Sequence, residues 1–187
     1  MLLKEVFDWV IKLIQDPAKK EFLSQALKKI PDYFWIIPAS STGKYHPAFA
    51  VEQHGLIKHS LAAVIIALDL FEAYPELTQD DQDDILVALV LHDSVKKGYP
   101  EQDHTVEGHE TLPREYFMDI SCLLPIGDYE RIMSLIYTHM GIWNQNKIPP
   151  APRLGYRISP AEIVHLADYL SSRKSLERIF RDHRFVY

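Results

Sequence analysis

Apolar side chains recur every three or four residues along most of this chain, which is the spacing of helices that bury one face. The clearest case is the stretch 55–73, where Ile57, Leu61 and Leu68 fall on the same face. The pattern predicts helices over the ranges 2–14, 17–30, 55–73, 78–92, 128–139 and from 159 onward, and another that contains or begins near residue 109. No alternation of apolar and polar residues extends beyond a few positions, so strands are not expected. The predicted fold class is all-α, with about seven helices.

Residues with the chemistry of helix caps stand at several of these boundaries. The pair Asp16-Pro17 combines an N-cap aspartate with a proline at the first helical position. Thr78 with Asp81, and Ser159 with Glu162, have the spacing of capping boxes, in which two side chains satisfy free N–H groups at a helix start. Local sequence alone therefore predicts where these helices begin.

Other boundaries rest on weaker signals. Asp128 is predicted to cap the helix that Gly141 ends. Pro113 fits only the first turn of the helix near residue 109, because a proline further inside would remove a hydrogen bond. Acids crowd the range 80–84, in the first turns of the helix over 78–92, where the helix dipole favours negative charge. We expect this placement to explain them better than calcium binding.

Two long stretches lack periodicity. The range 32–53 combines aromatic residues, small hydroxyls, a lysine and a histidine, and the range 143–156 carries several prolines. Long loops inside compact domains are commonly functional, and the aromatic residues argue against disorder. We therefore expect 32–53 to cover a binding site and 143–156 to run along its mouth.

Composition and length favour one globular domain over residues 1–187. The chain is 47% apolar and 25% charged, and 187 residues are enough to bury one sizeable core. The longest apolar stretch, 61–71, is interrupted by Asp69 and is shorter than the roughly 20 residues that a membrane span needs. No segment has the pattern of a signal peptide. Association with a membrane is not expected.

Net charge and cysteine content indicate which partners and which cellular compartment to expect. The formal net charge of −6 gives no general attraction to phosphate backbones, so long nucleic acid is not an expected partner. The single cysteine, Cys122, cannot form an internal disulfide, which favours a reducing compartment and hence the cytoplasm. An oligomer is compatible with these expectations.

Candidate chemistry centres on His92 and Asp93, which follow the apolar run of the helix predicted over 78–92. A neutral imidazole nitrogen and a carboxylate oxygen together suit first-row divalent metals. Further candidate ligands stand in or beside the other predicted helices: His59, His109, His139 and Asp168. In a small helical domain these side chains can converge on one point, so the sequence predicts a metal site.

The order and context of these residues resemble the HD-domain superfamily of metal-dependent phosphohydrolases. The resemblance covers about 54–172. It rests on the segments 55–61, 91–96, 108–110, 137–139 and 165–168. It implies a helical bundle whose motif core is preceded by accessory helices over 2–30 and a covering loop over 32–53. The segments 55–61 and 165–168 look most like HD domains of bacterial 3′→5′ exoribonucleases, although no oligonucleotide-binding barrel precedes them here.

The resemblance also implies a ligand set. By match to the family, one metal would be held by His59, His92, Asp93 and Asp168. In members with two metals, two further histidines bind the second ion, and His109 and His139 match those positions. Asp93 would then bridge the ions. Two divalent ions are therefore expected, and His and carboxylate ligands do not distinguish Mn, Fe, Co, Ni and Zn.

The expected activity is hydrolysis of a phosphate ester of a nucleotide or small phosphodiester by a metal-activated water. Asp93 and Lys96 are the candidate catalytic residues, because Lys96 lies one helical turn from Asp93 and can meet a phosphate oxygen. Candidate substrate-binding residues are Lys44, His46, His104, His165 and Arg173. Two alternatives stay open: a non-catalytic module that senses a nucleotide, and a di-iron oxygenase on an HD-like fold.

Overall fold

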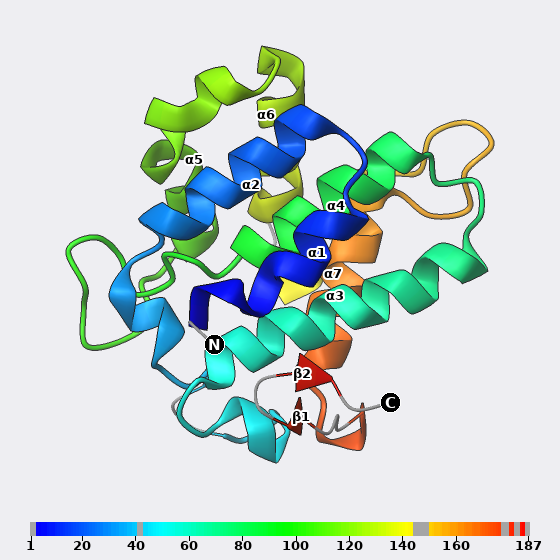
Figure 1. Ribbon diagram of the computed structural model, residues 1–187. Helices are drawn as coiled ribbons and strands as arrows, with labels where there is room; N and C mark the ends of the chain where they lie inside the picture. The colour runs from blue at the N-terminus through cyan, green and yellow to red at the C-terminus, as the bar shows by residue number, and fades with distance from the viewer. Residues whose placement is uncertain (1–2, 41–42, 144–149, 177–179, 182–183, 186–187) are drawn as a thin grey trace.

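The computed structural model describes residues 3–40, 43–143, 150–176, 180–181 and 184–185. Within these ranges it contains seven α-helices: α1 (Asp8–Leu13), α2 (Pro17–Lys29), α3 (Gly55–Ala73), α4 (Gln79–Leu91), α5 (Leu112–Tyr116), α6 (Ile126–Tyr137) and α7 (Pro160–Ser171) (Figure 1). The described 3-10 helices are η1 (Leu3–Phe7), η2 (Asp32–Trp35), η3 (Ala48–Ala50), η4 (His109–Thr111), η5 (Met118–Leu123), η6 (Gly141–Trp143) and η7 (Lys174–Leu176). Two short antiparallel strands, β1 (Phe180–Arg181) and β2 (Arg184–Phe185), form a hairpin near the C-terminus. The prediction of an all-α fold is confirmed. The two strands were not expected, because each is only two residues long and too short to show an alternating pattern.

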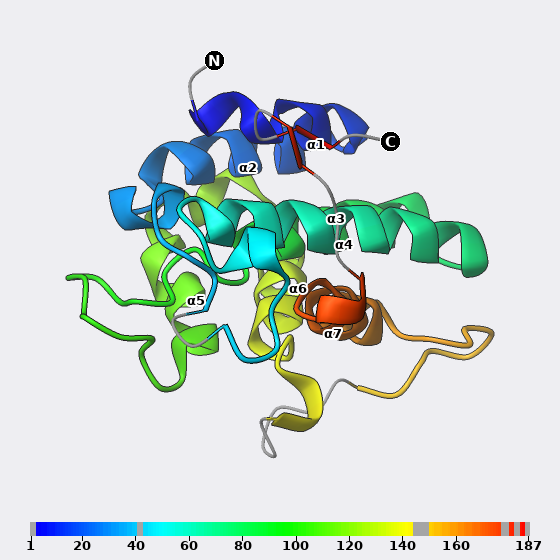
Figure 2. The ribbon, with the colours of Figure 1, turned by 90° about the horizontal axis from the view of Figure 1, so that it is seen from below.

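Four helices position the functional residues. α3 packs against α4 and α7, and α4 also contacts α6 and α7. Figure 2 shows α1 and α2 on one side of α3 and α4, with α7 on the other. The buried apolar side chains form one cluster that extends from Val6 to Ala167. None of the described helices has both the length and the apolar character needed to cross a bilayer.

The structure confirms the helix starts that local sequence predicts. Asp16 Oδ1 accepts hydrogen bonds from the backbone N–H groups of Ala18 and Lys19 at 2.7 and 3.0 Å. Thr78 and Ser159 each form a complete capping box with the acid three residues later. These contacts need only neighbouring residues, which is why sequence predicts them well.

Other predicted boundaries are wrong. The helix predicted over 2–14 is divided into η1 and α1. α6 begins at Ile126 after Pro125, so Asp128 lies inside its first turn and is not the cap. Near residue 109 the 3-10 helix η4 forms in place of an α-helix, although Pro113 does lie in the first turn of the following helix α5, as predicted. The prediction of irregular structure over 32–53 missed η2 and η3, because 3-10 helices of three or four residues are too short to show a period.

The helix dipole does not account for all the acids at the start of α4. Asp83 is buried, and its Oδ2 accepts hydrogen bonds from the backbone N–H groups of residues 15–16 at 2.9 and 2.8 Å. Asp84 is buried between Lys19 of α2 and Arg131 of α6, at 2.6 and 2.9 Å. These contacts join α4 to the helices on either side of it. Because α4 ends beside the candidate metal ligands, the network fixes the helix that carries them.

Candidate metal centre

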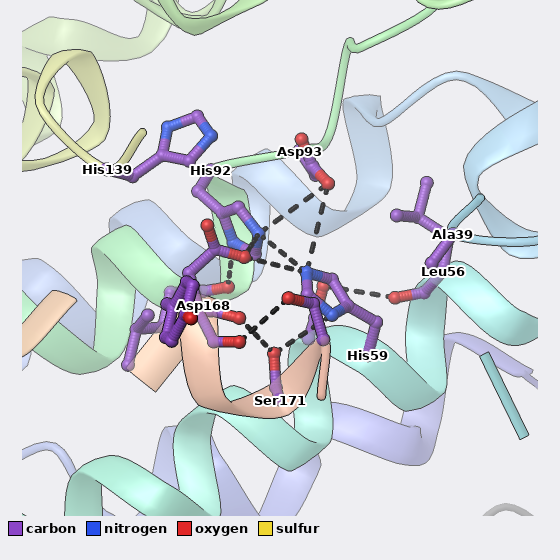
Figure 3. A network of polar contacts seen from close by, with 12 residues as sticks. Ala39, Leu56, His59, His92, Asp93, His139, Asp168 and Ser171 are labelled. Carbon is purple, nitrogen blue, oxygen red and sulfur yellow. Dashed lines mark hydrogen bonds and ion pairs between the residues drawn. The ribbon is translucent and has the colours of Figure 1, made fainter. Parts of the chain in front are cut away.

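The predicted ligands come from five separate elements and meet between α3, α4, α6 and α7. His59 lies on α3, and His92 and Asp93 follow directly after α4. The others are His109 at the start of η4, His139 just after the end of α6, and Asp168 on α7. Figure 3 shows His59, His92, Asp93 and Asp168 pointing toward one another. These side chains are buried except that of Asp168, which is 18% exposed.

The first set of donor atoms is held by α3, α4 and α7. His59 Nε2 and His92 Nε2 lie 3.2 Å apart. Asp168 Oδ1 lies 3.0 Å from the His59 nitrogen and 3.5 Å from the His92 nitrogen. Asp93 Oδ2 lies 3.9 and 3.7 Å from the same two nitrogens. Four donors from residues far apart in sequence therefore face a common centre.

A second set shares Asp93 with the first. Asp93 Oδ1 lies 3.2 Å from His109 Nε2. Ligand atoms of Asp93, His109 and His139 all lie within 4.8 Å of one another, as do those of His59, His92 and Asp93. The two oxygens of one carboxylate thus face two groups of donors, which is the arrangement expected of a ligand that bridges two ions.

Backbone contacts orient three of the imidazoles. In each, Nδ1 faces the carbonyl oxygen three residues earlier, at 2.8 Å for His92, 3.3 Å for His109 and 2.7 Å for His139. A carbonyl oxygen only accepts hydrogen bonds, so Nδ1 carries the hydrogen in each neutral ring. Nε2 then has a free lone pair that faces the centre, which is the form that binds a metal.

His59 reaches the same form through a side chain. Its Nδ1 lies 2.9 Å from Ser171 Oγ. The Ser171 hydroxyl donates its hydrogen to the carbonyl oxygen of Asp168 at 2.7 Å, so its oxygen is the acceptor for the His59 N–H. In the neutral form of the His59 ring, Nε2 is therefore also free of hydrogen. Ser171 controls the orientation of this ligand from outside the donor set (Figure 3).

The donor set fits divalent cations. When the rings are neutral, nitrogens without hydrogen and carboxylate oxygens face one another at distances near 3 Å, and such acceptors repel unless a positive charge, from a metal ion or a proton, lies between them. Asp93 Oδ1 is buried and accepts no hydrogen bond from the described residues. Nitrogen from imidazole and oxygen from carboxylate are suitable ligands for first-row divalent metals.

Charge states in the centre agree with this fit. Burial would raise the pKa of Asp93, but Lys96 and His92 hold it well below its usual range. Burial would likewise raise the pKa of Asp168, and the histidines beside it hold it well below. Burial, with the nearby His92, lowers the pKa of His139 to about 4. At neutral pH both carboxylates are charged and His139 is neutral, which are the states that ligate metals. Burial would lower the pKa of His92, but Asp93 and Asp168 raise it, so a metal that binds at this ring displaces a proton.

Comparison with known protein families agrees with the donor geometry. A family model described as HD domain matches residues 56–173. The chain belongs to the HD-domain family. Searches of curated proteins and of solved structures found no match. Membership of the superfamily is therefore confirmed, while the closer likeness to exoribonuclease HD domains stays a prediction.

A cavity of about 270 Å³ gives access to the centre of this HD domain. Besides five of the predicted ligands, it is lined by four residues predicted to act on the substrate: Lys96, His46, His165 and Arg173. The stretch 32–53 contributes Ala39, Ser40 and His46, as expected of a covering loop, although 41–42 lie outside the described residues. From the stretch 143–156 Trp143 lines the cavity, and 144–149 also lie outside the described residues.

Two predicted substrate residues do not reach this cavity. Lys44 is exposed, and its ammonium group is held over the Tyr45 ring, 4.9 Å from the centroid. His104 is exposed in the connection between α4 and η4 and lines a separate pocket beside Tyr99 and Glu115. Residue type and proximity in sequence suggested both positions, but the path of each loop directs them elsewhere.

Sequence reading missed Ser171 and Tyr169 on α7. Ser171 lies three residues after Asp168, a spacing that places both on one face of the helix. That spacing was available in the sequence, but nothing in it showed that the neighbouring helix would present His59 to the same hydroxyl. Tyr169 lines the cavity and packs against His165, with ring centroids 6.2 Å apart.

Replacing Ser171 by alanine is expected to weaken metal binding about 10- to 100-fold, because His59 loses the acceptor that fixes its ring. Ser24→Ala is the matched control, since the Ser24 hydroxyl also donates to a carbonyl oxygen, that of Lys20 at 2.7 Å, and Ser24 does not line the cavity. Metal affinity is measured by competition with a chelating dye, and ¹⁵N shifts of the metal-free protein report the His59 tautomer. Equal affinities and unchanged shifts in the two variants would contradict this role.

Proposed function

We propose that this HD-domain protein hydrolyses a phosphate ester of a nucleotide or small phosphodiester. The observation that carries the proposal is the buried carboxylate of Asp93, whose two oxygens face two groups of imidazole donors at the wall of a cavity. HD domains are generally metal-dependent hydrolases, which supports the reaction class. The choice of a nucleotide or phosphodiester is our own inference.

The ligand set divides between two ions. His59, His92, Asp93 and Asp168 would hold the first, and Asp93, His109 and His139 the second. Bound divalent ions supply Lewis-acid stabilisation of the phosphoryl oxygens and lower the pKa of water toward neutrality. The protein holds the ligand side chains in place, because each of these imidazoles makes a hydrogen bond through Nδ1, the ring nitrogen that does not face the centre.

Lys96 supplies a positive charge beside the bridging carboxylate. Its Nζ lies 2.5 Å from Asp93 Oδ2 and donates a hydrogen bond to the carbonyl oxygen of Ala39 at 3.2 Å. The second contact links the covering loop, through Ala39, to Lys96 in the turn that follows α4. An ammonium group at this place on the cavity wall can also meet a phosphoryl oxygen, as an electrostatic partner for the charge that develops there.

His165 and His46 add hydrogen-bonding groups to the same wall. His165 Nδ1 donates to the carbonyl oxygen of His139 at 2.8 Å, so its Nε2 is free to accept a hydrogen bond from a substrate hydroxyl. Gly141 makes this packing feasible, because a Cβ at that position would overlap the His165 ring. Burial, with nearby His59 and Lys96, lowers the pKa of His46 to about 4, so that ring is uncharged at neutral pH.

Cavity size and charge favour a small substrate. A volume of about 270 Å³ is at the lower end of small-molecule sites and suits a phosphate ester with part of a nucleoside. The net charge of −6 opposes binding to long nucleic acid away from the metal centre. A free nucleotide or short phosphodiester is therefore the substrate class that we propose.

The test is removal and return of metal. Protein stripped with a chelator is expected to lose hydrolysis of p-nitrophenyl phosphate, bis(p-nitrophenyl) phosphate and a panel of nucleotides, and to recover it with at least one of Mn, Fe, Co, Ni or Zn. The complete donor set argues against a vestigial sensing pocket, and a protein that binds metal and nucleotide without turnover would overturn the proposal. An iron-loaded protein that consumes oxygen instead would indicate the oxygenase alternative.

A further inference from the structure

We propose that Arg173 forms an anion-binding subsite in the cavity and takes a phosphate group of the substrate. The inference rests on the proposed function, since it concerns the same cavity, but its evidence is separate from the metal ligands. That evidence is the way in which the Arg173 guanidinium is held and the absence of a carboxylate partner among the described residues.

The other arginines with described side chains have acidic partners. Arg114 pairs with Glu130, Arg131 with Asp80, Asp84 and Asp128, Arg153 with Asp81, and Arg157 with Glu76. Arg173 has no such partner in the described part of the chain. The side chain nevertheless lines the cavity that reaches the metal centre. A guanidinium in this position without a protein anion has its charge available for a ligand.

Aromatic rings and polar atoms hold Arg173 in place. Its guanidinium carbon lies 4.3 Å from the centroid of the Tyr169 ring and 5.3 Å from that of Tyr45. Nε donates to the carbonyl oxygen of Tyr169 at 3.3 Å, and Nη2 donates to Ser172 Oγ at 3.0 Å. A guanidinium has five N–H groups, so Nη1 and the remaining Nη2 hydrogen have no hydrogen-bond partner among the described residues. These are the donors that form a two-pronged contact with phosphate.

The covering loop and α7 build this subsite together. The backbone N–H of Lys174 donates to the carbonyl oxygen of Tyr45 at 3.1 Å, which ties the loop to the end of α7. Tyr169, directly after the metal-ligand candidate Asp168, provides the second ring. The guanidinium is therefore in its binding position before a ligand arrives, which reduces the entropy lost on binding.

Lys96 cannot serve the same purpose. Among the described residues that line the cavity it is the other Lys or Arg, but its Nζ contacts Asp93 at 2.5 Å. A phosphate oxygen near the ions would share Lys96 with that carboxylate. Arg173 has only neutral partners in the described structure, so a phosphate gains the whole of its charge. The chemistry that matches it is a phosphate with two free oxygens, either at the metal ions or further along the substrate.

The test compares phosphate binding by metal-loaded Arg173→Gln, Arg173→Lys and wild-type protein. Arg153→Gln is the matched control, because Arg153 also lies over a tyrosine ring, 5.7 Å from the Tyr156 centroid, but does not line this cavity. Inorganic phosphate and pyrophosphate are titrated by calorimetry at constant ionic strength. Loss of a charged hydrogen-bond partner is expected to raise the dissociation constant about 10- to 100-fold in Arg173→Gln. Arg173→Lys keeps the positive charge but cannot make a bidentate contact, so it should raise the dissociation constant less.

The two probes identify which phosphate is bound. A weakened affinity for both would place the subsite at the phosphate that meets the ions, and weakening for pyrophosphate alone would place it at a second phosphate. Wild-type affinity for both probes in a metal-loaded, folded Arg173→Gln or Arg173→Lys protein would overturn the inference. Metal content and p-nitrophenyl phosphate turnover of the wild-type preparation test the proposed function separately.

Discussion

Asp93→Asn is expected to reduce phosphate ester hydrolysis about a thousandfold or more, equivalent to about 4 kcal/mol of transition-state stabilisation. The substitution replaces one carboxylate oxygen by an amide and removes the negative charge that faces both groups of donors. Metal affinity should fall at both positions, because neither group keeps an anionic oxygen from this residue. Turnover, metal content and thermal stability are measured on the same preparation.

Asp8→Asn is a suitable control for Asp93→Asn. Asp8 begins α1 and is exposed, so the same chemical change there should leave metal content and turnover unaltered. Turnover that survives in Asp93→Asn at the wild-type rate would point to a contaminating enzyme and would count against the proposed function. Wild-type metal content in that variant would show that Asp93 is not a ligand.

His139→Ala and His109→Ala are expected to lower the metal content from two ions per chain to about one, and to reduce turnover about 100- to 1,000-fold. Each change removes a ligand from the group that shares Asp93, while His59, His92 and Asp168 remain. Elemental analysis of protein purified without chelator measures the stoichiometry. The two variants should behave alike, because each loses a ligand of the same ion, the one held by Asp93, His109 and His139.

His104→Ala controls for the loss of an imidazole, since His104 is exposed and does not line the cavity. It should retain two ions and full turnover. A single ion in the wild-type protein that neither His139→Ala nor His109→Ala disturbs would refute the binuclear centre. The remaining ligands would then be His59, His92, Asp93 and Asp168, and a mononuclear hydrolase would replace the two-ion proposal.

Sequence was most informative where a few neighbouring residues decide the outcome. Capping by Asp16, Thr78 and Ser159 was predictable because each cap bonds to a backbone N–H within the next few residues. α3 was predictable from its long apolar face, and its observed bounds are the predicted ones. The start of α6 at Ile126 was predicted wrongly, because no side chain caps it and Asp128, which has the chemistry of a cap, lies inside its first turn.

The candidate ligands were identifiable because metal binding demands particular residue types, whatever surrounds them. Histidine and aspartate next to apolar helix faces are unusual enough to be noticed, and the HD-domain motifs add their order. The same reasoning failed for Lys44 and His104, which have suitable chemistry but do not line the cavity. Residue type alone does not reveal the direction in which a loop carries a side chain.

By itself, the sequence determined the all-α class, several helix starts and the residues with metal-binding chemistry, because these follow from local hydrogen bonding, periodicity and side-chain type. Only the tertiary structure decided that Asp93 faces two groups of donors, that Ser171 holds His59 and that Arg173 lies over two tyrosine rings. Each of these arrangements brings together residues that are far apart in sequence, such as His59 and Ser171 at a separation of 112 positions, or Tyr45 and Arg173. Such contacts depend on how helices pack against one another, and no local pattern in the chain encodes that packing.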